Sequence, residues 1–427
     1  MAISTFVWLP LVAACQKDVQ VYSNPDEGAQ IVVPAKGFTL RDRDFEWGFP
    51  GTVCEIENPE MSVQGVVRVL FRKWMTPNGY ADWREESLRK TAGVKNLTRI
   101  DESTPSRDFG SWIQRDWLVE LSRERLRYVF LAATRGSRVA EFLLWVDVNQ
   151  WEATKETLYR IVNSAIFQSV WYCGNCTRRV IRKAAACAAC GTPVYPPDSA
   201  LEEFSRKNDI QIITQPSETF MKALYPDGTI GATCAGEKLL ARFLPTLRTE
   251  ISRYPEGFFR GVDLERMIVG AELAWTGHEG TAGLATVWNA TILYRALDGL
   301  ILQESDRRAV HHEIMHFIDT RDDRRIEDPE WVKLNPWGFE YDRKKYGPER
   351  FDFNRSLTGF VSQYSMTNMA DDKAEIYGWL IARPQDVLER AKKDKWIAKK
   401  VEYVKKMAFK VSPQLDEEWW ESLLQSK

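Results

Sequence analysis

The sequence is poor in histidine, and it lacks both a long apolar run and an excess of charge of one sign. Four histidines occur in 427 residues, and the formal net charge is −2. No apolar stretch reaches the roughly 18 residues that a membrane-spanning helix needs, which excludes a transmembrane segment. Because the charge is balanced, no global basic field recruits nucleic acid or anionic lipid, and any partner must be recognised locally.

Cysteine is also scarce, since the chain has seven. Four of them form two C-x-x-C pairs with ten residues between the pairs, namely Cys173, Cys176, Cys187 and Cys190. Four thiolates at this spacing suit one tetrahedral zinc ion. Disulfides are the alternative, but a close pair fits one ion better than a bridge, and Cys15, Cys54 and Cys234 complete no obvious framework. We therefore expect a structural zinc ribbon over residues 169–198.

The segment between the two pairs, residues 178–183, is rich in arginine and lysine and could contact phosphates. No aromatic residue interleaves the basic ones, although base stacking on aromatic side chains usually accompanies such patches. We interpret the segment as a solvated hairpin, and the composition argues against a nucleic-acid partner.

Three of the four histidines lie close together, and two of them form the pattern His312-Glu313-x-x-His316. On a helix, His312 and His316 project from one face, so their imidazoles can bind one zinc ion. Glu313 is then placed to accept a proton from a zinc-bound water. This HExxH pattern predicts a catalytic zinc site on a helix over residues 300–319. His311 has no role in the pattern and is expected behind the ligands or in solvent.

A catalytic zinc needs a third protein ligand as well as an open position for water. Asp371 and Glu375 are four residues apart at the start of a predicted helix, so they share one face. One carboxylate can bind the zinc while the other orients a ligand histidine. Asn368 and Asp371 also resemble a helix capping box, so Asp371 could cap the helix instead. The residues alone leave these alternatives open.

The HExxH motif and the later segment from Tyr364 to Glu375 resemble those of gluzincin-clan zinc metallopeptidases, in particular the anthrax lethal factor-like peptidases and related bacterial zinc-binding metallopeptidases. The resemblance covers roughly residues 205–385. It implies that Asp371 is the third ligand, that Glu375 supports the site from a second layer, that Glu313 is the general base and that Tyr364 stabilises the oxyanion. The family has glutamate where this chain has Asp371, so either the helix lies closer here or Glu375 is the ligand.

A long strand is predicted over residues 284–294, directly before the zinc helix. In HExxH peptidases an edge strand commonly lies over the cleft, where an extended peptide can pair with it. On that interpretation Val287, Trp288 and Asn289 contact the substrate. An ordinary interior strand is the alternative.

The amino-terminal part is rich in short β-type runs that are separated by turn residues such as Asn24-Pro25-Asp26. This pattern predicts a small β-barrel, and the segment resembles bacterial Src-homology-3-like domains, which implies a protein partner. Further on, Leu126–Ala133 and Val139–Val148 predict a β-hairpin that is followed by a helix. The polar segment 76–110 is expected to be a linker.

The predicted fold class is therefore a multidomain α+β protein. The expected parts are a Src-homology-3-like barrel over 1–75, a linker and α+β module over 76–168, the zinc ribbon over 169–198, a zincin-like metallopeptidase domain over 199–385 and carboxy-terminal helices over 386–427. Val12-Ala13-Ala14-Cys15 resembles a lipoprotein signal that ends at residue 14, with Cys15 lipidated in the cell envelope. We prefer a cytoplasmic protein in which this stretch is a first strand.

The predicted function is a zinc-dependent endopeptidase that uses two zinc ions, one catalytic and one structural, and acts on a peptide or protein substrate. The alternative is a catalytically degenerate peptidase fold that serves as a scaffold and binds partners through its barrel and zinc ribbon.

Overall fold

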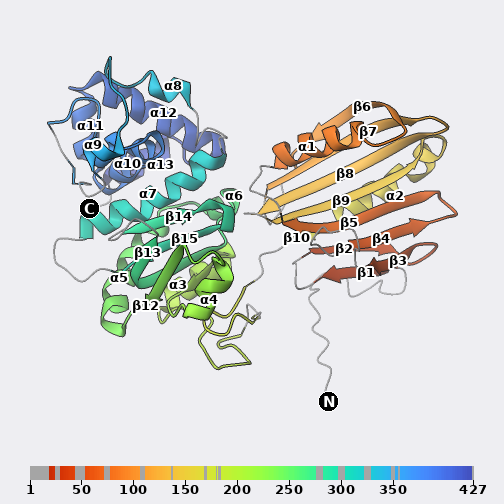
Figure 1. Cartoon of the computed structure of the whole chain (residues 1–427), viewed down its shortest axis with the longest axis horizontal. Coiled ribbons are helices and arrows are strands. Elements are labelled where there is room, and N and C mark those ends of the chain that lie inside the picture. Colours follow the sequence, from red (N-terminus) through yellow and green to blue (C-terminus); the bar gives the residue numbers. More distant parts are fainter. Residues whose placement is uncertain are drawn as a thin grey trace. The chain divides into compact units, whose positions relative to one another are not determined.

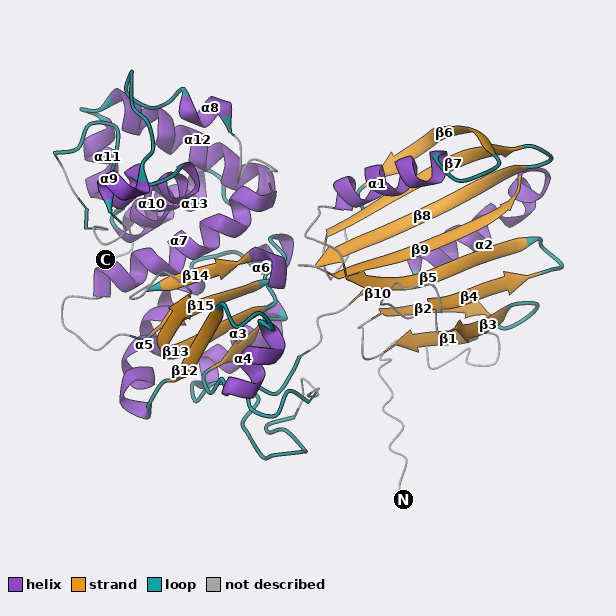
Figure 2. Ribbon diagram, viewed as in Figure 1, coloured by secondary structure: helices purple, strands orange, loops and turns teal. Residues whose placement is uncertain are grey.

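The computed structural model divides into two compact units, Met1–Val170 and Trp171–Lys427, which are described separately. Both contain helices and strands, so the chain is a mixed α and β protein with several sheets (Figures 1 and 2). Among the described residues, no helix is long and apolar enough to cross a membrane. The structure describes residues 19–24, 29–43, 53–71, 77–105, 111–135, 138–167, 171–178, 180, 184–275, 282–296, 303–321, 328–347, 352–353 and 356–425.

The first unit is built on a seven-stranded antiparallel sheet with the order β3-β4-β5-β9-β8-β7-β6 (Figure 2). Its strands are β3 (Thr39–Arg43), β4 (Val53–Asn58), β5 (Val63–Phe71), β6 (Val94–Ser103), β7 (Ser111–Leu121), β8 (Arg125–Arg135) and β9 (Arg138–Asp147). A three-stranded sheet of order β1-β2-β10 contains β1 (Val19–Asn24), β2 (Ala29–Pro34) and β10 (Ile166–Phe167).

Two helices cover opposite faces of the larger sheet. Strand β8 shows this directly, because its side chains alternate between the faces. Val129 packs in one cluster with Leu158 of α2 (Trp151–Asn163), which follows the turn η1 (Val148–Gln150). Phe130 packs in the other cluster with Tyr80 of α1 (Pro77–Arg89). The predicted hairpin of β8 and β9 and the helix after it are confirmed.

The expected barrel over residues 1–75 is not what the described strands form. Strand β5 pairs with β9 from Val63 to Phe71, so β3, β4 and β5 belong to one open sheet with the strands of the second predicted part. The expected linker is also wrong for its described residues, which contain α1 and β6. Both elements carry many charged residues and therefore gave no apolar pattern. Residues 1–18, with the predicted signal and Cys15, lie outside the described residues.

The second unit contains a mixed sheet in which β11, β13 and β15 are parallel, while β14 and β12 pair antiparallel with β15 and β13. Its strands are β11 (Gln211–Ile213), β12 (Ile230–Cys234), β13 (Arg266–Trp275), β14 (Gly283–Thr286) and β15 (Thr291–Arg295). Among the described strands, β14 ends the order β11-β13-β15-β14 and is therefore an edge strand.

Helices pack around this sheet and around one another (Figure 1). They are α3 (Ser199–Asn208), α4 (Glu218–Leu224), α5 (Glu237–Ile251), α6 (Phe258–Gly261), α7 (Gln303–Arg321), α8 (Pro329–Val332), α9 (Arg343–Tyr346), η3 (Tyr364–Met366), α10 (Met369–Ala382), α11 (Pro384–Ala391), α12 (Lys395–Val411) and α13 (Glu417–Gln425). Ile314 of α7, Val404 of α12 and Trp420 of α13 share one buried cluster. The expected boundary at residue 385 therefore does not separate two cores.

The predicted strand over residues 284–294 is interrupted. It divides into β14, the turn η2 (Val287–Asn289) and β15, which pair as a hairpin. The break occurs at Ala290, whose φ of 50° is left-handed and closes the turn. Neither glycine nor proline marks this position, so turn chemistry in the sequence did not reveal it.

The cysteine-rich segment belongs to the second unit and is fastened to β11. The Tyr172 N–H donates to Gln211 Oε1 over 3.2 Å, and Gln211 Nε2 donates back to the Tyr172 carbonyl over 2.6 Å. The Ser217 N–H donates to the Gly174 carbonyl over 2.7 Å. These contacts make the segment an attached part of the second unit rather than a free module.

Candidate metal centre

Helix α7 presents three of the predicted site residues on one buried stripe. Val310 and Ile314 turn into the apolar core, whereas His312, Glu313 and His316 are 4%, 6% and 7% exposed and lie on a different stripe. Spacing of four residues places the two imidazoles on the same face, with ring centroids 4.9 Å apart.

Helix α10 brings Asp371 to the two imidazoles. Asp371 Oδ1 lies 3.6 Å from His312 Nε2 and 3.6 Å from His316 Nε2. One ligand atom from each of the three residues lies within 4.8 Å of the others. In a tetrahedral zinc site with bonds of about 2.0–2.1 Å, neighbouring ligand atoms are about 3.3–3.4 Å apart. The three side chains therefore fit one zinc ion.

The second oxygen of Asp371 is held by the start of its own helix. Oδ2 accepts hydrogen bonds from Asn368 Nδ2 and, at 3.3 Å, from Thr367 Oγ1. Asn368 caps α10 by accepting the Asp371 N–H over 2.9 Å. Burial raises the pKa of Asp371, but the adjacent His312 and His316 and the hydrogen bond from Asn368 outweigh it, so the pKa lies below its usual value and the carboxylate is ionised. Capping and metal binding thus use different atoms of this segment.

Glu375 is surrounded by hydrogen-bond donors and faces the Nδ1 side of His312. Its Oε1 lies 2.9 Å from His312 Nδ1 and is ion-paired with Arg308. Its Oε2 accepts from Ser362 Oγ over 2.6 Å and from Trp379 Nε1 over 3.2 Å. With both oxygens occupied, the carboxylate is suited to hold the His312 ring so that Nε2 faces the metal position. Asp371, rather than Glu375, is therefore the carboxylate that groups with the two imidazoles.

Glu313 lies against the edge strand β14. A Cβ atom placed on Gly283 would lie 2.7 Å from Glu313 Oε1, so a larger residue at this point of the strand would displace the Glu313 side chain. Burial raises the pKa of Glu313 to about 7, while nearby His312 and Arg308 and a hydrogen bond with the Ala285 backbone act against the rise. A bound cation would lower this pKa and favour the ionised carboxylate, which is the form that can accept a proton.

Tyr364 lies beside the same group. Its ring centroid is 5.8 Å from that of His312, and the charges of Asp371, Glu313 and Glu375 act on its hydroxyl. Burial, with the surrounding carboxylates, raises the pKa of Tyr364 well above its usual value, so the phenol keeps its proton and remains a donor. The predicted position of Tyr364 near the metal site therefore agrees with this geometry.

His311 faces away from the metal group into a buried hydrogen-bonded cluster that the sequence did not reveal. Its Nε2 lies 2.8 Å from Glu250 Oε2, and its Nδ1 lies 2.8 Å from the Tyr254 hydroxyl. Burial lowers the pKa of His311, which keeps the ring neutral and lets it donate to Glu250 while accepting from Tyr254. His278, the remaining histidine, lies outside the described residues.

Two buried lysines fix the helix that carries Asp371. Lys373 Nζ lies 2.7 Å from Asp319 Oδ1 at the end of α7. Lys400 Nζ, on α12, lies 2.6 Å from Asp372 Oδ2. All four side chains are almost fully buried, and Lys373 Nζ also lies 2.9 Å from Asp328 Oδ2, so removing either lysine would leave a buried carboxylate uncompensated. The metal group therefore stands on rigid elements rather than on loops.

The predicted substrate-contacting residues do not form a strand. Val287, Trp288 and Asn289 make up the turn η2, where Val287 is buried in the core and Asn289 Nδ2 donates to the Leu224 carbonyl over 2.9 Å. Trp288 is 44% exposed. The edge-strand position belongs instead to β14, which contacts Glu313 through Gly283.

The four predicted ribbon cysteines form a second group of metal-ligating atoms. The Sγ atoms of Cys173 and Cys190 lie 3.5 Å apart, and those of Cys176 and Cys187 lie 3.6 Å apart. In a zinc site with bonds of about 2.3 Å, neighbouring sulfurs are about 3.8 Å apart, so the group fits one zinc ion. No disulfide links the six cysteines that the structure describes.

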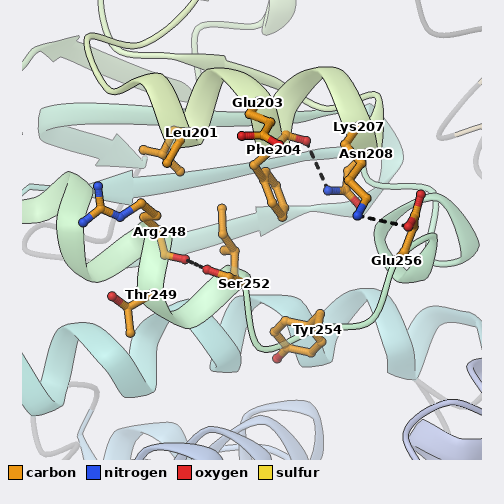
Figure 3. Close-up of a pocket in the computed structure, with 12 residues that line it drawn as sticks. Leu201, Glu203, Phe204, Lys207, Asn208, Arg248, Thr249, Ser252, Tyr254 and Glu256 are labelled. Carbon is orange, nitrogen blue, oxygen red and sulfur yellow. Dashed lines mark hydrogen bonds and ion pairs between the residues drawn. The ribbon is translucent and has the colours of Figure 1, made fainter.

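A cavity of about 500 Å³ lies between α3 and α5, apart from both groups of ligands (Figure 3). Its apolar lining includes Leu201, Phe204 and Tyr254. Two of the charged side chains that line it are paired, since Lys207 Nζ lies 3.0 Å from Glu256 Oε2 and Arg248 Nη1 lies 3.0 Å from Asp198 Oδ2. The cavity does not collect reactive groups and is not the candidate site.

Comparison with known proteins identifies no family. No protein-family model matches the sequence, and no curated protein matches it. Among solved structures, cyanobacterial PsbP (CyanoP) from Synechocystis sp. PCC 6803 aligns at 13% identity with a TM-score of 0.30, over 36% of this chain and 98% of that chain.

Two further solved structures align over similar lengths. Protein PA94 of unknown function from Pseudomonas aeruginosa aligns at 7% identity with a TM-score of 0.21, over 34% of this chain and 95% of that chain. A structure from Bacteroides thetaiotaomicron aligns at 10% identity with a TM-score of 0.23, over 35% of this chain and 48% of that chain. At TM-scores this low, none of the three alignments supports a functional inference, and the site must be judged by its own geometry.

Proposed function

We propose that this protein is a zinc-dependent endopeptidase whose catalytic zinc is bound by His312, His316 and Asp371. The observation that carries the proposal is the convergence of two imidazoles and one carboxylate oxygen within 4.8 Å, with Glu313 beside them on the same helix. Three protein ligands leave one tetrahedral position for water, which distinguishes a catalytic zinc site from a closed structural one.

The residues around the group have roles that suit hydrolysis of a peptide bond. Zinc bound there would act as a Lewis acid and lower the pKa of a coordinated water towards about 7. Glu313 accepts the proton of the attacking water and later donates it to the leaving amine. Tyr364 donates its hydroxyl proton in a hydrogen bond to the oxygen that develops negative charge. Glu375 orients His312 throughout.

The edge strand β14 indicates which class of substrate would bind beside Glu313. An unpaired strand edge can form main-chain hydrogen bonds with an extended peptide, whatever its side chains are. Because Gly283 of β14 contacts Glu313, a peptide that pairs with this edge would lie beside the general base. A polypeptide in extended form is therefore the proposed substrate.

The four-cysteine group completes the proposal as a structural zinc site. Its four thiolates leave no position for water, so this zinc would stabilise the fold rather than react. The hydrogen bonds between Tyr172 and Gln211 would then attach the zinc-stabilised ribbon to β11.

Glu313→Gln tests the proposal in the full chain. The amide cannot accept the proton, so cleavage of unfolded casein should fall by about 10²–10⁴-fold while zinc content stays near that of wild type. Glu330→Gln, an exposed glutamate on α8, is the matched control and should keep full activity.

Zinc-loaded wild type that cleaves neither casein nor a peptide library would contradict the proposal. A fold that binds metal but hydrolyses no peptide is what the scaffold alternative predicts.

A further inference from the structure

Gly378 lies where α10 comes closest to α7. A Cβ atom placed on this glycine would lie 2.9 Å from the Arg308 carbonyl oxygen, 3.1 Å from Arg308 Cγ and 3.4 Å from the His312 backbone nitrogen. Glycine inside a helix is destabilising relative to alanine. Its presence in the middle of α10 therefore fits a contact that leaves no room for a methyl group.

The same face of α10 carries the metal-site carboxylates. Asp371, Glu375 and Gly378 are spaced by four and three residues, which places them in one row along the helix. Asp371 lies opposite His316 and His312, and Glu375 lies opposite His312 and Arg308. Gly378 continues the row to Arg308, so the two helices run antiparallel and the glycine contact belongs to the interface that holds the ligands.

The length of Asp371 makes the separation of these helices critical. An aspartate reaches about 1.5 Å less far than a glutamate, because its side chain has one carbon–carbon bond fewer. Even so, Asp371 Oδ1 lies 3.6 Å from the Nε2 atoms of both His312 and His316. The short side chain can reach both imidazoles only because the backbone of α10 is close to α7.

We infer that Gly378 is a positioning residue, which permits the close approach of α10 to α7 and thereby lets an aspartate serve as the third metal ligand. The inference rests on the metal site of the proposed function. Glu375 cannot take over if the approach is lost, since its two oxygens already contact His312, Arg308, Ser362 and Trp379.

The inference makes residues 371 and 378 depend on each other. In Gly378→Ala the new methyl group meets a backbone carbonyl of α7, so one helix must shift by several tenths of an ångström, and metal sites tolerate only about 0.5 Å. In Asp371→Glu the longer side chain is crowded at the native helix separation. With both changes, the longer side chain spans the wider gap.

Metal affinity in the full chain measures this dependence. Wild type, Gly378→Ala, Asp371→Glu and the double variant are titrated with a competing zinc chelator, and the loss of the non-thiolate zinc is followed. Each single variant should bind that zinc about tenfold or more weakly, as expected when a ligand is misplaced. The double variant should bind about tenfold more tightly than Gly378→Ala, which is coupling rather than additivity.

Gly261→Ala is the matched control. Gly261 has an ordinary φ, and a Cβ atom placed on it meets nothing within 4 Å. Its affinity for zinc should remain within about twofold of wild type, because a change in open space leaves the ligands in place.

The inference is overturned if Asp371→Glu lowers affinity by the same factor in both backgrounds, or if Gly378→Ala binds zinc like wild type. If circular dichroism shows that Gly378→Ala does not fold, the Asp371→Glu variant decides alone. A zinc affinity of Asp371→Glu equal to or above that of wild type would contradict crowding of the longer side chain at the native distance between α7 and α10. If the wild type binds zinc but cleaves no peptide, the proposed activity is wrong and this inference stands. If the wild type cleaves peptides but the effects of the two substitutions are additive, this inference is wrong and the proposed activity stands.

Discussion

The two groups of metal-ligating side chains in the second unit are built in different ways. The cysteine group is formed within residues 173–190 by two short turns, and its nearest hydrogen-bond donors are local, such as the Asn175 N–H at 3.4 Å from Cys173 Sγ. The histidine group is formed by two long helices, and its supporting contacts come from residues far apart in the chain. The group of four thiolates can thus be formed locally, whereas the histidine group depends on tertiary packing.

His316→Ala should have the largest effect and separates the two groups most clearly. Removing one of three ligands should reduce zinc content from about two equivalents to about one and abolish peptidase activity, because the remaining two ligands hold a catalytic zinc poorly. Elemental analysis beside a casein assay checks both. If two equivalents remained after the substitution, His316 would not be a ligand.

Tyr364→Phe should remove one transition-state donor and leave the metal in place. Loss of a single oxyanion donor typically costs about 10²–10³-fold in kcat. Steady-state kinetics should show this loss in kcat with little change in KM, and zinc content should stay at the wild-type value. A change confined to KM would indicate that Tyr364 binds substrate rather than the developing oxyanion.

Glu375→Gln should weaken, without destroying, the histidine group. The amide still contacts His312 but loses the ion pair with Arg308, and changes to such supporting residues typically cost about 10–100-fold in metal affinity. Chelator competition measures the change, and exposed Glu417→Gln is the control. An effect as large as that of Asp371→Ala would instead favour Glu375 as the ligand.

Cys187→Ser should reduce stability more than it reduces activity. One zinc equivalent should be lost, and the unfolding temperature should fall, because a structural zinc site contributes its binding free energy to folding. Peptidase activity at 25 °C should remain within about tenfold of wild type, since the histidine group is supported by other contacts. Equal loss of activity and stability would show that the two sites are one cooperative structure.

The sequence predicted the parts of both groups that depend on local spacing. His312, Glu313 and His316 follow helical periodicity, and the four cysteines follow the spacing of two metal-binding turns. The sequence could not decide whether Asp371 or Glu375 groups with the imidazoles, because the answer depends on which carboxylate is held by Arg308, Ser362 and Trp379. None of these three residues belongs to a recognisable motif.

Secondary structure was predicted correctly where apolar runs were long. It was missed where charged residues interrupt the apolar periodicity. The hairpin of β8 and β9 has continuous apolar runs that predict buried strands. Helix α1 and strand β6 carry charged side chains that pair between the helix and the strand, such as Arg99 with Glu85 at 2.8 Å, and such pairs leave no apolar period in the sequence. The break at Ala290 was missed because an alanine seldom adopts a left-handed φ.

Anomalous scattering at the zinc edge from crystals of the wild-type protein tests the central claim most directly. The account predicts one peak about 2.0–2.2 Å from His312 Nε2, His316 Nε2 and Asp371 Oδ1, and a second peak among the four cysteine sulfurs. A peak bonded to Glu375, or no peak between α7 and α10 in zinc-loaded crystals, would contradict it.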